Sequence, residues 1–276
     1  MALELELQTP SSIPLEVDTV RLENVVGQSA EEVAKTLIQR GNRQVELGEF
    51  FRVNGSAADD ETIVWRGDCS KVKLIGSTWQ RGSIRVEGNA GMHLGAEMSG
   101  GDILVEGNVT DWAGAEMKGG RITIKGNAGH LVGAVYRGGR KGMTGGEILI
   151  EGNAGNEIGH TMRRGLIAIG GNIGDVAGVG MIAGTILSFG EVGIRHGAGM
   201  KRGTIGLFGT ESPVEMLPTF RYSCTYRPTF LPLYFTQLKR CGFPVPDECF
   251  GAMYRRYCGD LLETGKGEIL TRVASA

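Results

Sequence analysis

The sequence predicts an all-β protein, a right-handed parallel β-helix with coils of about 19 residues. Glycine makes up 46 of the 276 residues, without the glycine at every third position that collagen requires. One glycine-rich phrase recurs at a short, fixed period, which is the signature of a solenoid. Apolar residues alternate within each phrase, and side chains two residues apart share a face only in a strand.

The repeat defines one strand per unit. Units start at residues 61, 82, 101, 120, 146, 165, 184 and 203, and the third residue of every unit is isoleucine: Ile63, Ile84, Ile103, Ile122, Ile148, Ile167, Ile186 and Ile205. The fifth residue is apolar in Val86, Val105, Ile124, Ile150, Ile169 and Leu207. Strands stacked ~4.8 Å apart would make a rod of roughly 35 Å with a narrow apolar core.

Glycine and asparagine predict the corners between the strands. The seventh residue of each unit is glycine and the eighth is asparagine in most units, as in Gly107 and Asn108. The fourteenth residue is again glycine, as in Gly114. Both residue types tolerate left-handed backbone, so we expect a turn at each position. The seventeenth residue is Met98, Met117, Tyr136, Met162, Met181 and Met200, which we expect to fill the core.

The segments that flank the repeat divide the chain into residues 1–60, 61–209 and 210–276. In the first, "LELEL" and "PLEVDTVRL" predict short strands, and residues 27–42 predict a helix with a Ser29–Glu32 capping box. This segment is expected to cap the rod, because an open coil exposes unpaired backbone. In the last, helices are expected over 233–240 and 252–262, and the density of Phe and Tyr predicts a docking surface.

Composition narrows the classes of partner and the compartment. Lys and Arg number 29 against 31 Asp and Glu, which argues against nucleic acid or an anionic membrane as the main partner. No apolar run is long enough for a membrane span, and the N-terminus lacks the pattern of a signal peptide. Five cysteines at irregular spacing, without a CxxC pair, predict reduced thiols in a cytoplasmic protein.

The sequence predicts neither a catalytic residue nor a metal ligand, and it leaves cofactor binding open. The four histidines (His93, His130, His160 and His196) occupy four different positions of the unit, so they do not form a ligand cluster. Glu97 and Glu116 share a position in adjacent units, which allows an acid–base pair, but we favour an exposed corner with Lys118 nearby. No phosphate-binding loop or nucleophile elbow is present.

Basic residues form the candidate contact surface. The unit that starts at residue 120 carries an insertion, "VYRGGRKGMTGG", whose Arg137, Arg140 and Lys141 would meet an acidic partner or a polyanion, or simply be solvated. A basic row also recurs at the ends of successive units: Arg81, Lys118, Arg137, Arg163, Arg164, Lys201 and Arg202. Stacking would bring this row to one edge of the rod, as a seat for another subunit or an oligo-anionic tail. Solubility alone would also explain such a row.

The unit GxIxVxGNxGxxxGxxMxxG resembles the GXGXG-motif β-helix shared by glutamate synthase and the C subunit of formylmethanofuran dehydrogenase. The second resemblance is closer, through "GNRQVELGEFFRVNG", "YRGGRKGMTGG" and "GNAGNEIG". The tail, with "RPTFLPLYFTQLKRCGFPVP" and "YRRYCGDLLETGKGEIL", is more similar to the bacterial relatives in this family, the C subunits of formyltransferase/hydrolase complexes.

This resemblance implies a scaffold without catalytic residues. In such complexes an amidohydrolase-like subunit holds the metals that hydrolyse the formamide, and another subunit transfers the formyl group. Together with a further subunit they release formate from formyl groups that pass from tetrahydromethanopterin through a methanofuran-type cofactor. The implied alternative is the C subunit of a molybdenum or tungsten formylmethanofuran dehydrogenase. A free-standing polysaccharide enzyme and a glutamate-synthase-like domain fit less well, since neither a gathered acidic face nor a synthase region is present.

Overall fold

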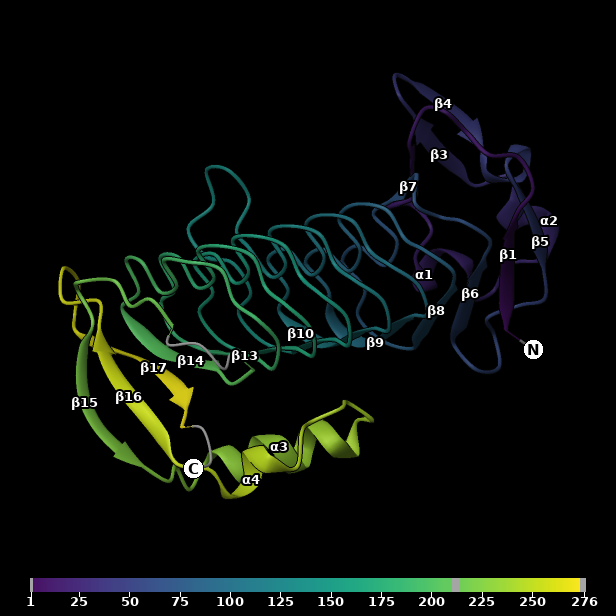
Figure 1. Ribbon diagram of the computed structural model, residues 1–276. Coiled ribbons are helices and arrows are strands. Elements are labelled where there is room, and N and C mark those ends of the chain that lie inside the picture. The colour runs from purple at the N-terminus through teal and green to yellow at the C-terminus, as the bar shows by residue number, and fades with distance from the viewer. Residues whose placement is uncertain (1, 210–213, 274–276) are drawn as a thin grey trace.

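The computed structural model describes residues 2–209 and 214–273, so the start of the predicted C-terminal segment at residue 210 lies outside the described residues. The chain passes through stacked turns along a rod, with the N-terminal segment at one end and the C-terminal segment at the other (Figure 1). Thirteen strands form one sheet in the order β15-β16-β17-β14-β13-β12-β11-β10-β9-β8-β6-β1-β5. The protein is therefore mostly β with a large, mostly parallel sheet, as predicted.

Each repeat unit contributes one strand to this sheet. These strands are β6 (Thr62–Arg66), β8 (Ser83–Glu87), β9 (Ser99–Val105), β10 (Gly119–Ile124), β11 (Glu147–Ile150), β12 (Leu166–Ile169), β13 (Thr185–Ser188) and β14 (Arg202–Leu207). Neighbours pair in parallel, and the third-position isoleucines lie opposite one another from Ile63–Ile84 to Ile186–Ile205. None of these isoleucines is more than 2% exposed, so the predicted register is the one that fills the core.

The sheet continues beyond the repeat at its N-terminal end. Strand β1 (Leu3–Leu7) pairs in parallel with β6, and β5 (Phe51–Asn54) pairs with β1 in the antiparallel sense. A second sheet of four strands lies beside them: β2 (Leu15–Glu16), β3 (Leu37–Arg40), β4 (Arg43–Glu46) and β7 (Val72–Lys73). The short helices of this segment are α1 (Leu22–Val25), α2 (Ala30–Ala34) and a 3-10 turn at Leu47–Glu49.

The helix predicted over residues 27–42 is wrong in its second half. The capping box is present, because the Ser29 backbone N–H donates to the Glu32 carboxylate over 2.8 Å and the Glu32 N–H donates back to the Ser29 hydroxyl. However, α2 ends at Ala34, and β3 pairs with both β2 and β4. Ile38 is 1% exposed within this small sheet, so tertiary strand pairing and burial override the helical pattern.

At the other end the chain returns to the sheet, which the loss of the repeat after residue 209 had not predicted. Strand β17 (Lys266–Arg272) pairs in parallel with β14 and places Ile269 opposite Ile205. Its sequence Gly-Glu-Ile-Leu at 267–270 repeats residues 146–149, and this was the available signal. Strands β16 (Tyr254–Gly259) and β15 (Arg221–Tyr226) follow in the antiparallel sense.

Of the two C-terminal helices predicted, the first is present and the second is wrong. Helix α3 spans Leu231–Arg240, and a short α4 spans Glu248–Gly251. Most of the range 252–262 is strand β16 instead. This strand pairs with β17 on one side and β15 on the other. The pairing provides hydrogen-bond partners for the backbone N–H and C=O groups along the edge of β17, which a helix at 252–262 would leave unpaired.

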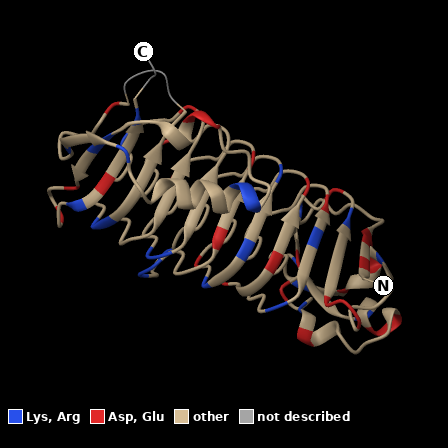
Figure 2. Cartoon of the chain, turned by 90° about the horizontal axis from the view of Figure 1, so that it is seen from below, with Lys and Arg blue, Asp and Glu red and all other residues tan. Residues whose placement is uncertain are grey.

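The aromatic residues of the C-terminal segment mostly build a second core. In β8 the side chains alternate between buried and exposed, whereas β11, β12 and β13 are buried on both faces, apart from the first residue of β11. Helix α3 lies across that outer face (Figure 2), and Phe235 packs against Phe189 and Phe208 at ring distances of 6.0 and 5.7 Å. The aromatic density that predicted a docking surface is therefore used largely within the chain.

The two predicted corners have different physical causes. At the fourteenth position the glycines are left-handed, with φ from +60° at Gly95 to +72° at Gly197, as predicted. The asparagines at the eighth position, and most of the glycines at the seventh such as Gly107, are not left-handed, contrary to the prediction. Instead the asparagine side chains form a ladder, in which each amide oxygen accepts the backbone N–H of the next unit over 2.8 Å, from Asn89 through Asn108, Asn127, Asn153 and Asn172 to Glu191.

Replacing Asn127 with alanine is expected to lower the free energy of unfolding by about 1 kcal/mol, because the Asn153 N–H loses its acceptor. The control is Asn127→Asp, which keeps an oxygen in the same place and should recover most of the loss. Urea denaturation of the three proteins measures the difference. Equal stability of Asn127→Ala and the parent would show that the ladder contributes nothing.

Candidate functional site

The insertion projects from the rod as a loop with an anchored base (Figure 1). Tyr136 at this base stacks on Trp112 at 5.2 Å, and its hydroxyl lies 2.9 Å from Nδ1 of His93. Met143, which is fully buried, takes the core position that the sequence assigned to Tyr136. The predicted contact residues of the insertion, Arg137, Arg140 and Lys141, are all exposed.

The predicted basic row divides into paired and unpaired residues. Arg81 forms an ion pair with Glu61, Lys118 with Glu97 at 3.1 Å, and Lys201 with Glu263 at 3.9 Å. Arg163, Arg164 and Arg202 are exposed and form no ion pair within residues 2–209 and 214–273. Lys and Arg recur along the edge of the rod at which the strands begin (Figure 2).

Four members of the row surround a basic hollow of about 540 Å³. They are Arg163 and Arg164 from one unit and Lys201 and Arg202 from the unit two further on. Tyr234 of α3, Thr264, Gly165 and residues 182–185 also line this hollow. Stacking thus gathers at one place cations that lie almost 40 residues apart in sequence, while Arg81 and Lys118 do not line this hollow.

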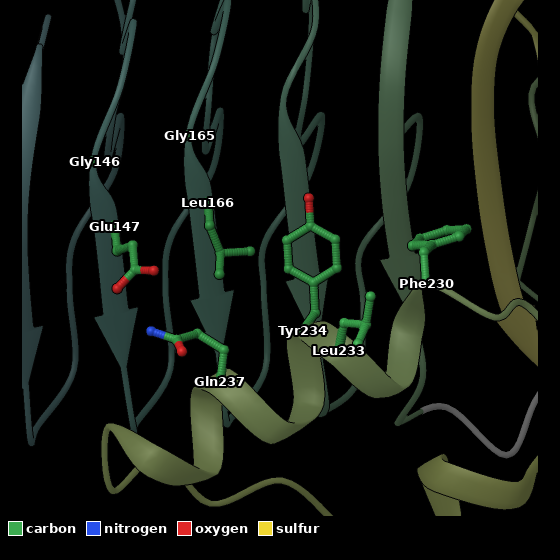
Figure 3. Close-up of a pocket in the computed structure, with 8 residues that line it drawn as sticks. All are labelled: Gly146, Glu147, Gly165, Leu166, Phe230, Leu233, Tyr234 and Gln237. Atoms are coloured by element: carbon green, nitrogen blue, oxygen red, sulfur yellow. The ribbon is translucent and has the colours of Figure 1, made fainter.

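A second, more apolar hollow of about 500 Å³ adjoins the first, and sequence reasoning missed it. Its floor is formed by Gly146, Glu147, Gly165 and Leu166, and its wall by Phe230, Leu233, Tyr234 and Gln237 (Figure 3). The wall residues have the spacing of one helix face, which was the available signal. Gly165 and Tyr234 line both hollows. The Glu147 carboxylate is paired with Arg121 at 3.0 Å.

The histidines contact other residues of the chain and do not cluster. Nδ1 of His130 accepts the Asn156 N–H over 2.9 Å, as one step of a second ladder beside the asparagines. His160 lies 3.2 Å from the Glu157 carboxylate. His196 is 3% exposed and its Nε2 donates to the Gly193 carbonyl, and burial lowers the pKa of this histidine. In the part of the chain that the structure describes, no group of three or more His, Cys, Asp or Glu is placed to hold a metal ion.

The carboxylates and thiols are also accounted for. Glu97 is paired with Lys118, as we favoured, and Glu116 accepts the Tyr136 N–H over 3.1 Å. All five cysteines are free thiols, and burial raises the pKa of Cys69 to about 12, which disfavours a nucleophilic thiolate. Within the described ranges, no helix has the length and apolar character needed to cross a membrane.

Comparison with known proteins gives consistent results. A family model for the GXGXG motif matches residues 71–216. The C subunit of a molybdenum-containing formylmethanofuran dehydrogenase from Methanosarcina barkeri is 41% identical over 85 residues, 30% of this chain and 28% of that protein. The tungsten-containing counterpart from Methanothermobacter thermautotrophicus is 43% identical over 87 residues, 30% of this chain and 32% of that protein. The match thus spans about a third or less of these relatives.

A solved structure matches over nearly the whole length. It is a chain in the crystal structure of the formyltransferase/hydrolase complex FhcABCD from Methylorubrum extorquens with methylofuran. The TM-score is 0.88 at 32% identity, and the match covers 98% of this chain and 100% of that one. The protein therefore belongs to the GXGXG-motif family, which includes the C subunits of formylmethanofuran dehydrogenases and the matched chain of FhcABCD.

Proposed function

We propose that this protein is a non-catalytic scaffold subunit of a cytoplasmic formyltransferase/hydrolase complex. The observation that carries the proposal is the match to FhcABCD over 98% of the chain, which includes the C-terminal segment with its second core. In the proposed assembly, an amidohydrolase-like subunit, a formyltransferase subunit and a further subunit generate formate. The formyl groups come from tetrahydromethanopterin by way of a methanofuran-type cofactor, and metal and cofactor are held mainly by those other subunits.

The architecture supports a scaffold role. The side chains most suited to chemistry, such as Glu97, Glu116 and His130, are engaged in contacts between successive units. We infer that the parallel ladder is a right-handed β-helix of about 19-residue coils, which would offer long, rigid faces to neighbouring subunits. Residues 1–60, 61–209 and 210–276 remain the proposed parts, as cap, β-helix and docking extension.

The basic row has a proposed role in this scaffold. Arg163, Arg164 and Arg202 lack acidic partners among the residues described, so their charge is available to a neighbour. The exposed tip of the insertion, with Arg137, Arg140 and Lys141, is a second proposed contact. Arg81 and Lys118 are weaker candidates, because each is paired within the chain.

A second candidate is the C subunit of a molybdenum or tungsten formylmethanofuran dehydrogenase. The local identities of 41% and 43% to such subunits favour it. The lower coverage, about 30% of this chain in both cases, makes it the second choice.

The test is purification of the tagged chain from its native cells, followed by mass spectrometry and metal analysis. We expect the chain to copurify with an amidohydrolase-like and a formyltransferase subunit, and the complex to release formate. A molybdenum- or tungsten-pterin subunit in the complex would favour the second candidate. Activity of the isolated chain on a formamide or a glycan would contradict the scaffold role.

A further inference from the structure

The two hollows meet to form one composite groove, which we define by its basic end, its apolar end and their junction. Arg163, Arg164, Lys201 and Arg202 form the basic end. Phe230 and Leu233 of α3, with Leu166 of β12, form the apolar end. Tyr234 and Gly165, which are labelled in Figure 3, line both hollows, and the Tyr234 hydroxyl lies 3.3 Å from that of Thr185. The groove is therefore amphipathic along its length.

The face of α3 that lines the apolar end is exposed, whereas the adjacent face of the same helix is buried. Leu231, Phe235 and Leu238 pack into the second core and are at most 1% exposed. Leu233, on the groove side of the same helix, is 73% exposed. Leu233 and the half-buried Phe230 therefore present an apolar surface to any occupant of the hollow that they line.

The charge of the basic end is not balanced within the chain. Glu147, the one carboxylate among the lining residues of the two hollows, is paired with Arg121, and Glu263 is paired with Lys201. Arg163, Arg164 and Arg202 have no such partner in the described part of the protein. The groove therefore suits an occupant that presents at least two carboxylates beside an apolar group.

The length of the groove indicates an extended segment. Its lining residues include Gly146, Gly165, Gly184 and Arg202, at or just before the starts of four adjacent strands. Four strands ~4.8 Å apart span about 14 Å, the length of four or five residues of extended chain at ~3.3 Å each. The groove runs across these strands, along α3.

We infer that the composite groove holds a short extended segment of a partner subunit, with an apolar side chain against Leu233 and acidic side chains at the unpaired Arg163, Arg164 and Arg202. This inference rests on the proposed function, because it requires a multi-subunit complex. A simple polyanion would use the basic end only and would leave Phe230 and Leu233 uncovered. The occupant is therefore a mixed apolar and acidic peptide rather than a purely anionic chain.

The first experiment measures how tightly the copurified partner subunits, depleted of this chain, bind the immobilised full-length protein. The groove variants are Arg163→Glu with Arg164→Glu, and Leu233→Asp. We expect each to weaken binding by about tenfold or more, with unchanged circular dichroism. The matched controls, Arg43→Glu with Lys71→Glu, both exposed and away from the proposed contacts, and Leu37→Asp on β3, should stay within about twofold if the groove is the contact.

Several outcomes would overturn the inference. Unchanged affinity of both groove variants would do so, even if the wild-type chain assembles normally and the proposed function stands. Loss in the arginine variant alone, with full competition by deca-L-glutamate, would indicate a polyanion site instead. Failure of the wild-type chain to copurify with any partner would remove both the inference and the proposed function.

The second experiment identifies the segment directly. A benzoylphenylalanine placed at Leu233 is photo-crosslinked in the purified complex, and the crosslinked peptide is sequenced by mass spectrometry. We expect a peptide from a partner subunit with two or more Asp or Glu within about five residues of an apolar side chain, the span of the groove. A crosslink to a second copy of this chain, or to a partner peptide without carboxylates, would contradict the inference.

Discussion

Replacing Gly114 with alanine is expected to lower the free energy of unfolding by about 2–5 kcal/mol. The glycine has a φ of +62°, and an added Cβ would lie 2.5 Å from Cδ1 of Ile148 and 3.3 Å from Cδ1 of Ile122. The substitution therefore combines backbone strain with a clash against two core isoleucines. Urea and thermal denaturation measure the loss.

The matched control for this prediction is Gly138→Ala in the insertion. Gly138 has a φ of +84°, but a Cβ added there has no heavy atom within 4 Å. Its cost should be limited to the backbone term of about 1–2 kcal/mol. If both variants lost the same stability, the close contact between the isoleucine column and Gly114 would contribute nothing to the cost of the Gly114 substitution.

Replacing Phe235 with alanine should cost about 3–5 kcal/mol in the second core. Its side chain is fully buried, and its ring contacts those of Phe189, Phe208 and Phe250 at 6.0, 5.7 and 5.5 Å. Because this core joins α3 to the sheet, the loss should appear as faster hydrogen exchange over 231–240. Exchange of β8 and β9 should change little, since repeat units contact mainly their neighbours.

Leu233→Ala is the control on the same helix. At 73% exposure, its removal should change the stability of the isolated chain by less than about 0.5 kcal/mol. The two variants thus separate the face of α3 that stabilises the fold from the face that lines the composite groove. Equal destabilisation would mean that Leu233 is packed in solution, contrary to its place in the groove.

The repeat made the register of the main sheet predictable. An isoleucine in every unit must face inward, and a shift of one residue would turn the whole column toward solvent. The same reasoning failed in the unit with the insertion, where Met143 rather than Tyr136 fills the core. Counting along the sequence cannot show where an inserted loop leaves and rejoins the column.

Short segments outside the repeat were predicted less well, because their partners lie far away in sequence. Residues 37–40 and 254–259 have helix-compatible patterns but form strands β3 and β16 between other strands. The outward apolar residues Leu149, Ala168 and Leu187 were a usable sign that something covers the later strands. The identity of the cover, helix α3, depended on tertiary packing.

By itself the sequence determined the mostly parallel sheet, its register and the glycine corners at the fourteenth position, since a constraint repeated in every unit is local and additive. Tertiary structure decided which charges are free and which side chains form a site. Whether Lys118 or Arg163 has an acidic partner depends on neighbours in adjacent units, and the composite groove exists only because α3 returns across strands β11 to β13. Ion pairs and hollows form between residues that are far apart in the sequence, so no single stretch of sequence encodes them.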